Sequence, residues 1–259
     1  SLITAMAGRG YDKADLIDAG LAVAGKSGGV YDKYRNRLML PVIDVRGDVI
    51  GFTSRVMDDS TPKYLNTPET AIFKKRSILY GLNYAKNTKR PNFILVEGNI
   101  DVITLHQAGF DNTVATMGTA LTEEHIRLLG RYTKELVLCY DNDAAGEDAT
   151  QRAIALLRNS EVGVKVLRLP RRRTEDGELV KQDADDYIKN CGPAAFEELM
   201  NGSSNSAEYR LSVVQAGFDL SRDDQRAQYL LAAAEVLAGL PSPVEREIYA
   251  GRCAEAAGV

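Results

Sequence analysis

The sequence predicts an α/β fold, with a mostly parallel sheet flanked by helices between an α+β segment and a helical segment. Two patterns predict the sheet: short apolar runs of strand length, and helical patterns between them. The runs lie at residues 93–96, 113–116, 136–140 and 164–169. Short apolar strands that alternate with helices are typical of a parallel sheet covered on both faces. We therefore expect a central subdomain over residues 91–190.

Residues 1–90 have the pattern of a smaller α+β subdomain. Two short strand patterns, at residues 38–43 and 49–52, flank the turn signal Arg46-Gly47-Asp48, which predicts a β-hairpin. The whole chain has a net charge of -4, yet residues 31–90 carry 12 basic and 6 acidic side chains. Because a partner responds to the local field rather than to the total charge, this segment is the candidate surface for a polyanion.

Residues 191–259 predict a small helical subdomain. Apolar residues recur there at helical spacing without any strand run, as in Tyr229, Leu230, Ala233, Val236 and Leu237. The pattern ends at the break Leu240-Pro241-Ser242-Pro243. No residue of this segment carries chemistry that we can interpret.

Composition excludes several classes of protein. No apolar run approaches the roughly 20 residues of a membrane span, and the first residues lack the pattern of a signal peptide. Cys139, Cys191 and Cys253 lie far apart, so we expect neither a zinc site nor disulfides. The chain begins in mid-pattern without an initiating Met, and we expect a domain of a longer protein.

Carboxylates follow two of the predicted strands at the point where each strand ends. Glu97 follows the first run, with Asp101 one step into the next helix, and Asp141 and Asp143 follow the third run. The carboxyl ends of parallel strands share one edge of a sheet, which is where open α/β sheets bind ligands. A third acidic group lies beyond the last run and its polar loop, at Asp183, Asp185 and Asp186.

The acidic pattern favours a site for divalent metal. The spacing of Asp141 and Asp143 places both side chains on one side of an extended backbone, which brings two negative charges together. A hard divalent cation with oxygen ligands offsets this repulsion, and such ions also activate hydroxyls and bind phosphates. The alternative is that these acids are solvated loop residues, with Asp183 or Asp185 capping the helix that begins near Tyr187.

Several stretches resemble the catalytic core of bacterial DnaG-type replicative primases, including its Toprim motifs. The two Toprim-like stretches are Val96-Glu97-Gly98-Asn99-Ile100-Asp101-Val102 and Cys139-Tyr140-Asp141-Asn142-Asp143-Ala144-Ala145-Gly146. Further matches lie at residues 31–41, 46–55, 62–70, 73–82 and 115–122. The resemblance covers most of the chain and is faintest in the helical tail.

The resemblance implies a Toprim-type sheet and roles for the acidic residues. Glu97, Asp141 and Asp143 would be the principal ligands of Mg²⁺ or Mn²⁺, and Glu97 would also act as general base. Asp101 would be a further catalytic carboxylate, and Asp183 and Asp185 would complete the metal cluster. The chain departs from the family pattern without losing a proposed ligand, at Asn99, Ile100, Asn142, Ala184 and Asp186.

The basic segment fits the same interpretation. A polymerase that handles a template needs cations for phosphates and flat side chains for unstacked bases, and residues 31–90 contain both. The resemblance implies contacts to template or incoming nucleotide at Arg55, Lys63, Tyr64, Asn66 and Lys75. The alternative is a solvated face. A second basic run, Arg171-Arg172-Arg173, is interpreted as a surface loop.

The activity implied is the synthesis of short RNA primers from NTPs on single-stranded DNA, by a cytoplasmic monomer at the replisome. We expect no membrane partner. The replicative helicase and single-strand binding protein would bind through regions largely absent here, since the chain has little room for a helicase-interaction domain.

Other functions stay open. Toprim proteins also break and rejoin phosphodiesters, but topoisomerase action needs a nucleophilic Tyr, and none of the 12 tyrosines lies in a recognised pattern. A non-enzymatic module would instead bind single strands through residues 31–90, with its acids holding a structural ion. A phosphatase-like use of Asp141 and Asp143 would leave Glu97 and Asp101 without a role.

Overall fold

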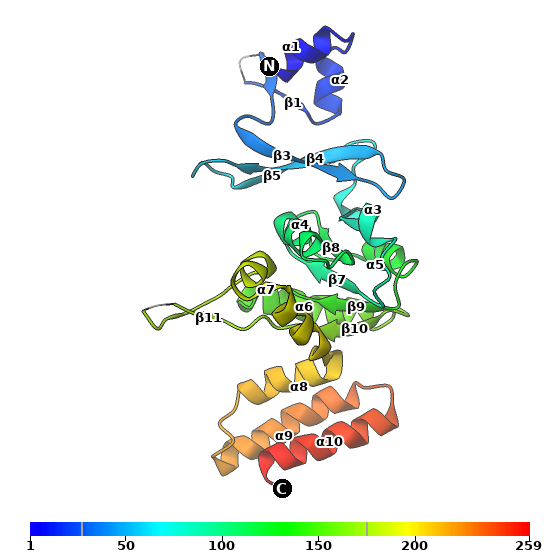
Figure 1. Cartoon of the computed structure of the whole chain (residues 1–259). Helices are drawn as coiled ribbons and strands as arrows, with labels where there is room; N and C mark the ends of the chain where they lie inside the picture. Colours follow the sequence, from blue (N-terminus) through cyan, green and yellow to red (C-terminus); the bar gives the residue numbers. More distant parts are fainter. Residues whose placement is uncertain (27, 175) are drawn as a thin grey trace.

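The centre of the molecule is a mostly parallel sheet (Figure 1). The computed structural model describes residues 1–26, 28–174 and 176–259. The parallel strands lie side by side in the order β8 (Thr113–Thr116), β7 (Phe93–Val96), β9 (Glu135–Leu138) and β10 (Gly163–Val166). Antiparallel edge strands follow on either side, namely β6 (Leu79–Tyr80) beside β8 and β13 (Ser204–Asn205) beside β10. The predicted α/β class is confirmed.

Helices cover both faces of this sheet because successive side chains of each strand are apolar. Phe93 and Leu95 pack in the core with α3 (Leu82–Ala85), α5 (Glu123–Leu129) and α6 (Ala144–Leu157). Ile94 and Val96 pack in the opposite core with α4 (Asn99–Gln107) and α7 (Ala184–Asn201). With both faces buried, the carboxyl edge of the strands is the part of the sheet left to bind ligands.

The N-terminal part is built around an antiparallel sheet of β3 (Arg37–Ile43), β4 (Val49–Val56) and β5 (Tyr64–Asn66). The hairpin expected over residues 38–52 is the β3–β4 pair. Ahead of it come α1 (Leu2–Ala7), α2 (Lys13–Asp18), β1 (Ala22–Ala24) and β2 (Val30–Asp32). This part lies at one end of the elongated molecule and the C-terminal helices lie at the other (Figure 1).

The N-terminal sheet is joined to the central sheet by packing and by hydrogen bonds. Met117, which follows β8, is buried against Val42 and Phe73. Near the short 3-10 helix η1 (Lys75–Ser77), His125 of α5 hydrogen-bonds the Lys75 carbonyl through Nε2 at 2.9 Å. The same ring accepts a hydrogen bond from the backbone N–H of Thr122 at Nδ1, so Nε2 carries the proton.

The C-terminal part consists of α8 (Ser206–Ala216), α9 (Asp223–Ala238) and α10 (Pro243–Ala257) with a core of their own. Tyr229 and Ala233 of α9 pack there with Tyr249 and Cys253 of α10. The break predicted near residue 241 is the turn between α9 and α10. None of the helices in the described residues is both long enough and apolar enough to span a membrane.

The division of the chain at residues 90 and 190 stays a prediction. The central sheet takes β6 and β13 from outside residues 91–190, and α7 continues across residue 190 to a kink at Gly192.

The run Arg171-Arg172-Arg173, expected in a surface loop, is exposed but enters a β-hairpin, in which β11 (Arg172–Arg173) pairs with β12 (Leu179–Val180). This hairpin projects from the side of the sheet (Figure 1).

The turn from β9 into α6 depends on Gly146. Asp143 caps α6, because its Oδ1 accepts a hydrogen bond of 2.9 Å from the backbone N–H of Gly146. A Cβ added to Gly146 would lie 2.0 Å from the carbonyl oxygen of Asp141. The spacing Asp-x-Asp-x-x-Gly is therefore a packing requirement, since only glycine lets α6 approach the Asp141 backbone so closely.

Gly146→Ala is expected to lower the free energy of unfolding by about 1–3 kcal/mol, because the new methyl group must push α6 away from Asp141. Gly251→Ala in α10 is the matched control, since a Cβ there meets nothing within 4 Å. It should be neutral or stabilise by up to about 1 kcal/mol. Denaturant unfolding of both variants checks this, and a Gly146→Ala protein as stable as the wild type would contradict the packing requirement.

His125 should make the stability of the fold depend on pH. Its pKa is lowered, chiefly because burial disfavours the charged imidazolium. The unfolded chain takes up this proton below about pH 6.5, whereas the folded chain resists it, so the stability contributed by His125 is complete above that pH. It is lost as the pH falls through the lower pKa of the folded state.

His125→Gln is therefore expected to lower the Tm near neutral pH and also to reduce the further loss of Tm between about pH 7.5 and about pH 5.5. Thermal unfolding of both proteins at the two pH values measures this. An equal loss of Tm on acidification in both proteins would show that His125 does not titrate with folding.

Candidate metal and nucleic-acid site

Glu97 and Asp141 meet at the carboxyl edge of the central sheet. Glu97 directly follows β7 and Asp141 lies just beyond β9, and these two strands are neighbours in the sheet. The backbone N–H of Asp141 donates a hydrogen bond of 3.0 Å to Oε1 of Glu97. The pKa of Glu97 is raised, first by burial and then by the charges of Asp141 and Asp143. The structure thus brings the first two predicted acidic groups together.

A lysine that the sequence did not single out lies between the two aspartates. Nζ of Lys181 is 2.7 Å from Oδ2 of Asp143 and 3.5 Å from Oδ2 of Asp141. Its hydrogen bond holds the pKa of Asp143 below the usual value, and the same bond raises the pKa of Lys181. An ammonium group therefore lies at the position where the sequence predicts a divalent cation.

Asp101 is buried and joins the starts of two helices. Its Oδ2 accepts a hydrogen bond of 3.1 Å from the backbone N–H of Gly98, where α4 begins. Its Oδ1 accepts a hydrogen bond of 3.0 Å from the backbone N–H of Asp185 in α7. Burial is the main reason that its pKa rises to about 7, and the charge of Asp183 adds to the effect. Through these contacts Asp101 positions the start of α7, which carries Asp183 and Asp185.

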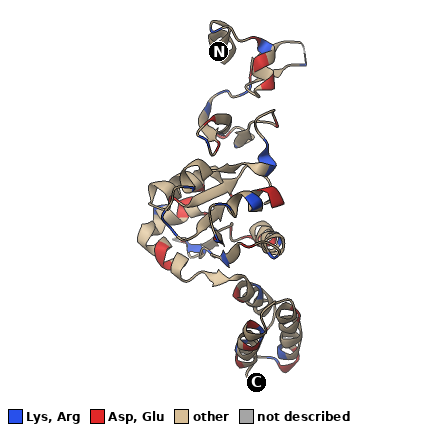
Figure 2. Cartoon of the chain, turned by 90° about the vertical axis from the view of Figure 1, so that its right-hand side faces the viewer, with Lys and Arg blue, Asp and Glu red and all other residues tan. Residues whose placement is uncertain are grey.

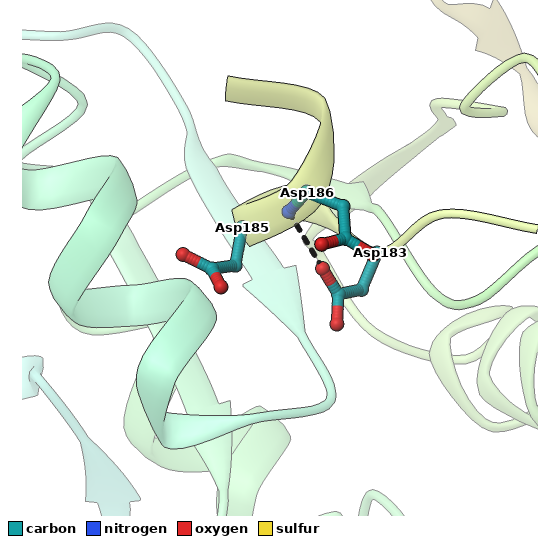
Figure 3. Close-up of side chains that lie close together, drawn as sticks. All are labelled: Asp183, Asp185 and Asp186. Carbon is teal, nitrogen blue, oxygen red and sulfur yellow. Dashed lines mark hydrogen bonds between the residues drawn. The ribbon is translucent and has the colours of Figure 1, made fainter. Parts of the chain in front are cut away.

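The third acidic group lies at the start of α7 (Figure 3). Carboxylate oxygens of Asp183, Asp185 and Asp186 all lie within 4.8 Å of one another. Asp183 also caps α7, since its Oδ1 accepts a hydrogen bond of 2.8 Å from the backbone N–H of Asp186. Among the described residues, these three acids are the group whose oxygens lie close enough together to share one ion. The predicted principal trio of Glu97, Asp141 and Asp143 does not lie that close together.

Asp185 already holds two partners. The hydroxyl of Thr104 donates a hydrogen bond of 2.6 Å to its Oδ1, and Nζ of Lys189 lies 2.5 Å from its Oδ2. Thr104 is on α4, so this contact adds to the link that Asp101 makes between α4 and α7. Asp185 thus has a structural role in addition to its predicted one.

We call Glu97, Asp101, Asp141, Asp143, Asp183 and Asp185 the carboxylate rim. Its donor atoms are hard oxygens, which suit Mg²⁺ and Mn²⁺. Burial raises the pKa of Glu97, Asp101 and Asp183. The charges of neighbouring acids raise each of these pKa values further. Lys181 and Lys189 act as counter-ions to other members of the rim. A site that raises carboxylate pKa values and attracts ammonium groups fits a divalent cation.

The predicted nucleic-acid residues Arg55, Lys63 and Tyr64 lie on β4 and at the start of β5. Arg55 and Tyr64 are partners across the two strands, and Nζ of Lys63 lies 5.8 Å from the centroid of the Tyr64 ring. Tyr64 is 41% exposed. Its pKa is raised, first by burial and then by acids that include Asp101 and Asp183, so the ring lies within electrostatic reach of the rim.

Asn66 and Lys75 continue this basic surface toward the central sheet. Nδ2 of Asn66 donates a hydrogen bond of 3.2 Å to the carbonyl of Met117, while its Oδ1 is buried and has no partner among the described residues. Nζ of Lys33 donates a hydrogen bond of 3.1 Å to the carbonyl of Asn66. Burial and the nearby charge of Lys75 lower the pKa of Lys33.

Sequence reasoning missed Lys33 and Lys181, because no local pattern marks either residue. Both become visible only when distant segments meet: Lys33 with β5, and Lys181 with the end of β9. Acidic and basic ribbon segments lie close together in the middle part of the molecule (Figure 2).

Family models match three consecutive parts of the chain. Residues 1–86 match the family described as DNA primase catalytic core, N-terminal domain. Residues 94–188 match a Toprim-like family. Residues 207–259 match a family described as the DnaB-helicase binding domain of primase.

Relatives match over nearly the whole chain. The DNA primase of Clostridium acetobutylicum is 40% identical over 259 residues, which are 100% of this chain and 42% of that protein. The DNA primase of Escherichia coli is 38% identical over 244 residues, which are 92% of this chain and 40% of that protein. The chain spans about two fifths of the length of these curated relatives.

Solved structures share the fold at similar identity. A DNA primase domain from Pseudomonas aeruginosa is 36% identical with a TM-score of 0.74, covering 95% of this chain and 76% of that one. A DnaG primase catalytic domain bound to ssDNA is 34% identical with a TM-score of 0.78, covering 100% and 80%. The RNA polymerase domain of Mycobacterium tuberculosis DnaG with double-stranded DNA is 30% identical with a TM-score of 0.84, covering 100% and 81%.

One expectation from the sequence is wrong. The helicase-interaction region was expected to lie largely outside this chain, yet residues 207–259, which contain α8 from Ala207 onward together with α9 and α10, match a helicase-binding family. The apolar periodicity of these helices determines how they pack and does not identify a partner.

The two Toprim-like stretches, the mixed sheet and the neighbouring basic segment agree with these matches. Family models match residues 1–86 and 94–188, and the solved primase domains are 34–36% identical over 95–100% of the chain. The chain therefore belongs to the DnaG-type DNA primase family, in which it corresponds to the catalytic core.

Proposed function

We propose that this chain synthesises short RNA primers from NTPs on single-stranded DNA, by nucleotidyl transfer that depends on Mg²⁺ or Mn²⁺. The observation that carries the proposal is the meeting of Glu97, Asp141 and the start of α7 at one edge of the sheet, with Tyr64 and its basic neighbours beside them. A polyanionic template and the triphosphates that react on it need such a pairing of cation-binding and phosphate-binding surfaces.

Metal ions would be held by Glu97, Asp141, Asp143, Asp183 and Asp185. When bound, they supply positive charge that stabilises the phosphates during transfer and makes the attacking hydroxyl more acidic. Glu97 is our proposed general base, because its raised pKa brings it nearer the working pH than an ordinary carboxylate. Asp101 contributes by holding the starts of α4 and α7 in place.

The template and the incoming nucleotide would lie on the basic surface. Tyr64 offers an exposed ring for a base to stack on, and Lys63 and Arg55 lie next to it. Asn66 and Lys75 extend the surface toward the Met117 loop. A similar catalytic domain has been solved with bound ssDNA, which supports the proposal that this chain binds a single strand.

We propose a monomer that works in the cytoplasm at the replisome. Residues 207–259 would contact the replicative helicase, as the description of the matching family suggests. Single-strand binding protein would bind to other parts of the full-length primase.

Asp141→Asn is expected to reduce dinucleotide synthesis by at least about 100-fold, because it removes a charged ligand while keeping the side-chain shape. Asp148→Asn on the exposed side of α6 is the matched control and should keep wild-type activity. The assay uses the chain with Mn²⁺, NTPs and a single-stranded template, and EDTA should abolish synthesis. Full activity of Asp141→Asn would refute the proposed role of Asp141.

Tyr64→Ala is expected to weaken binding of a single-stranded oligonucleotide by about 5- to 150-fold, since a stacked base contributes about 1–3 kcal/mol. Tyr132→Ala, which removes another partly exposed ring just beyond α5, should leave the affinity unchanged. Fluorescence anisotropy at fixed salt measures both. Equal affinities of wild type and Tyr64→Ala would remove the ring from the template path.

A further inference from the structure

The backbone beside Lys181 is held in place at the base of the β11–β12 hairpin. Nε2 of Gln182 donates a hydrogen bond of 2.7 Å to the carbonyl of Pro170, and Gln182 is buried. Nδ2 of Asn142 donates a hydrogen bond of 3.0 Å to the carbonyl of Leu169. Gln182 at the hairpin base and the loop that carries Asp141 and Asp143 therefore bond to adjacent carbonyls, those of Pro170 and Leu169, a few residues beyond β10.

This arrangement brings the Lys181 ammonium to two carboxylates at once. It contacts Oδ2 of Asp143 at 2.7 Å and lies 3.5 Å from Oδ2 of Asp141. The lysine side chain is 57% exposed, whereas those of Asp141 and Asp143 are 30% and 35% exposed. The aspartates are thus held by the fold, and the lysine has open solvent into which it can turn.

Lys189 provides a useful contrast. It pairs with Asp185 one helical turn away on α7, an i,i+4 contact within one helix that touches a single carboxylate. Lys181 instead reaches across from another element and occupies the space between two carboxylates, which is the space that a shared cation needs.

We propose that Lys181 is a displaceable counter-ion, which offsets part of the negative charge of Asp141 and Asp143 when no metal is bound and competes with divalent cations for them. The inference rests on the proposed function, because it assigns metal binding to the same two aspartates. A divalent ion must displace the ammonium before it reaches both carboxylates. Lys181 therefore weakens metal binding to the chain alone and favours entry of the metal together with a nucleotide, whose phosphates supply further ligands.

Binding of Mn²⁺ to the nucleotide-free chain tests this directly, by isothermal titration calorimetry or by electron paramagnetic resonance of free Mn²⁺. Lys181→Met removes the charge and keeps most of the side-chain length, and is expected to tighten Mn²⁺ binding about tenfold. Lys181→Arg keeps the charge and should stay within about threefold of the wild type. Unfolding temperatures establish that the variants fold.

Lys134→Met is the matched control. It changes the net charge by the same amount and removes an exposed ion pair with Glu161, away from the rim. Mn²⁺ affinity should not change in this variant. Unchanged or weaker affinity in Lys181→Met, or equal tightening in Lys134→Met, would overturn the inference.

Asp141→Asn separates this inference from the proposed function. If Asp141→Asn loses Mn²⁺ binding while Lys181→Met does not tighten it, the counter-ion role fails and the metal site stands. If Asp141→Asn binds Mn²⁺ as the wild type does, the assignment of metal to Asp141 fails, and the inference fails with it. Should neither the wild type nor Lys181→Met bind Mn²⁺, both proposals fail.

Discussion

The structure depends on how it offsets the repulsion among carboxylates that the fold brings to one edge of the sheet. Parallel strands β7 and β9 end side by side, so the acids that follow them cannot avoid one another. Part of the negative charge is held by backbone N–H groups, as at Glu97 and Asp101. Another part is neutralised by lysines, as at Asp143 and Asp185. The charge that is left is what a divalent cation would offset.

The fold supports this arrangement with short links between its segments. Gly146 lets α6 approach the carbonyl of Asp141, and Asp101 joins the starts of α4 and α7. Asn66 and Met117 connect the basic surface to the central sheet. The links through Asp101 and Asn66 couple segments that are far apart in the chain. The proposed metal ligands and the proposed template surface can therefore keep a fixed spacing although they belong to different parts of the molecule.

Much of the fold follows from local patterns. The short apolar runs at β7, β8 and β9 lie between helical patterns and so mark buried parallel strands, and the acids after β7 and β9 are placed by the rule that ligands bind at the carboxyl edge. The edge strands β6 and β13 could not be predicted because two-residue strands have no period. The β11–β12 hairpin was missed for the same reason. The packing of Met117 on Phe73 depends on contacts between distant segments.

The site was predictable in its residue types and less so in its contacts. The pattern of Asp183 and Asp185 predicted either a metal ligand or a helix cap, and the structure shows that Asp183 is a cap within a tight acidic group. Neither the burial of Asp101 nor the position of Lys181 has a local signal, because both arise when α7 and its preceding hairpin fold back onto the sheet. The sequence pattern of residues 191–259 predicted how the C-terminal helices pack but did not identify a binding partner.

The most direct test of the account is anomalous diffraction from crystals of this chain soaked in Mn²⁺. The account predicts a Mn²⁺ peak between Asp141 and Asp143, with the Lys181 side chain turned away from both. Peaks confined to other positions, with Lys181 still between the two aspartates, would contradict it.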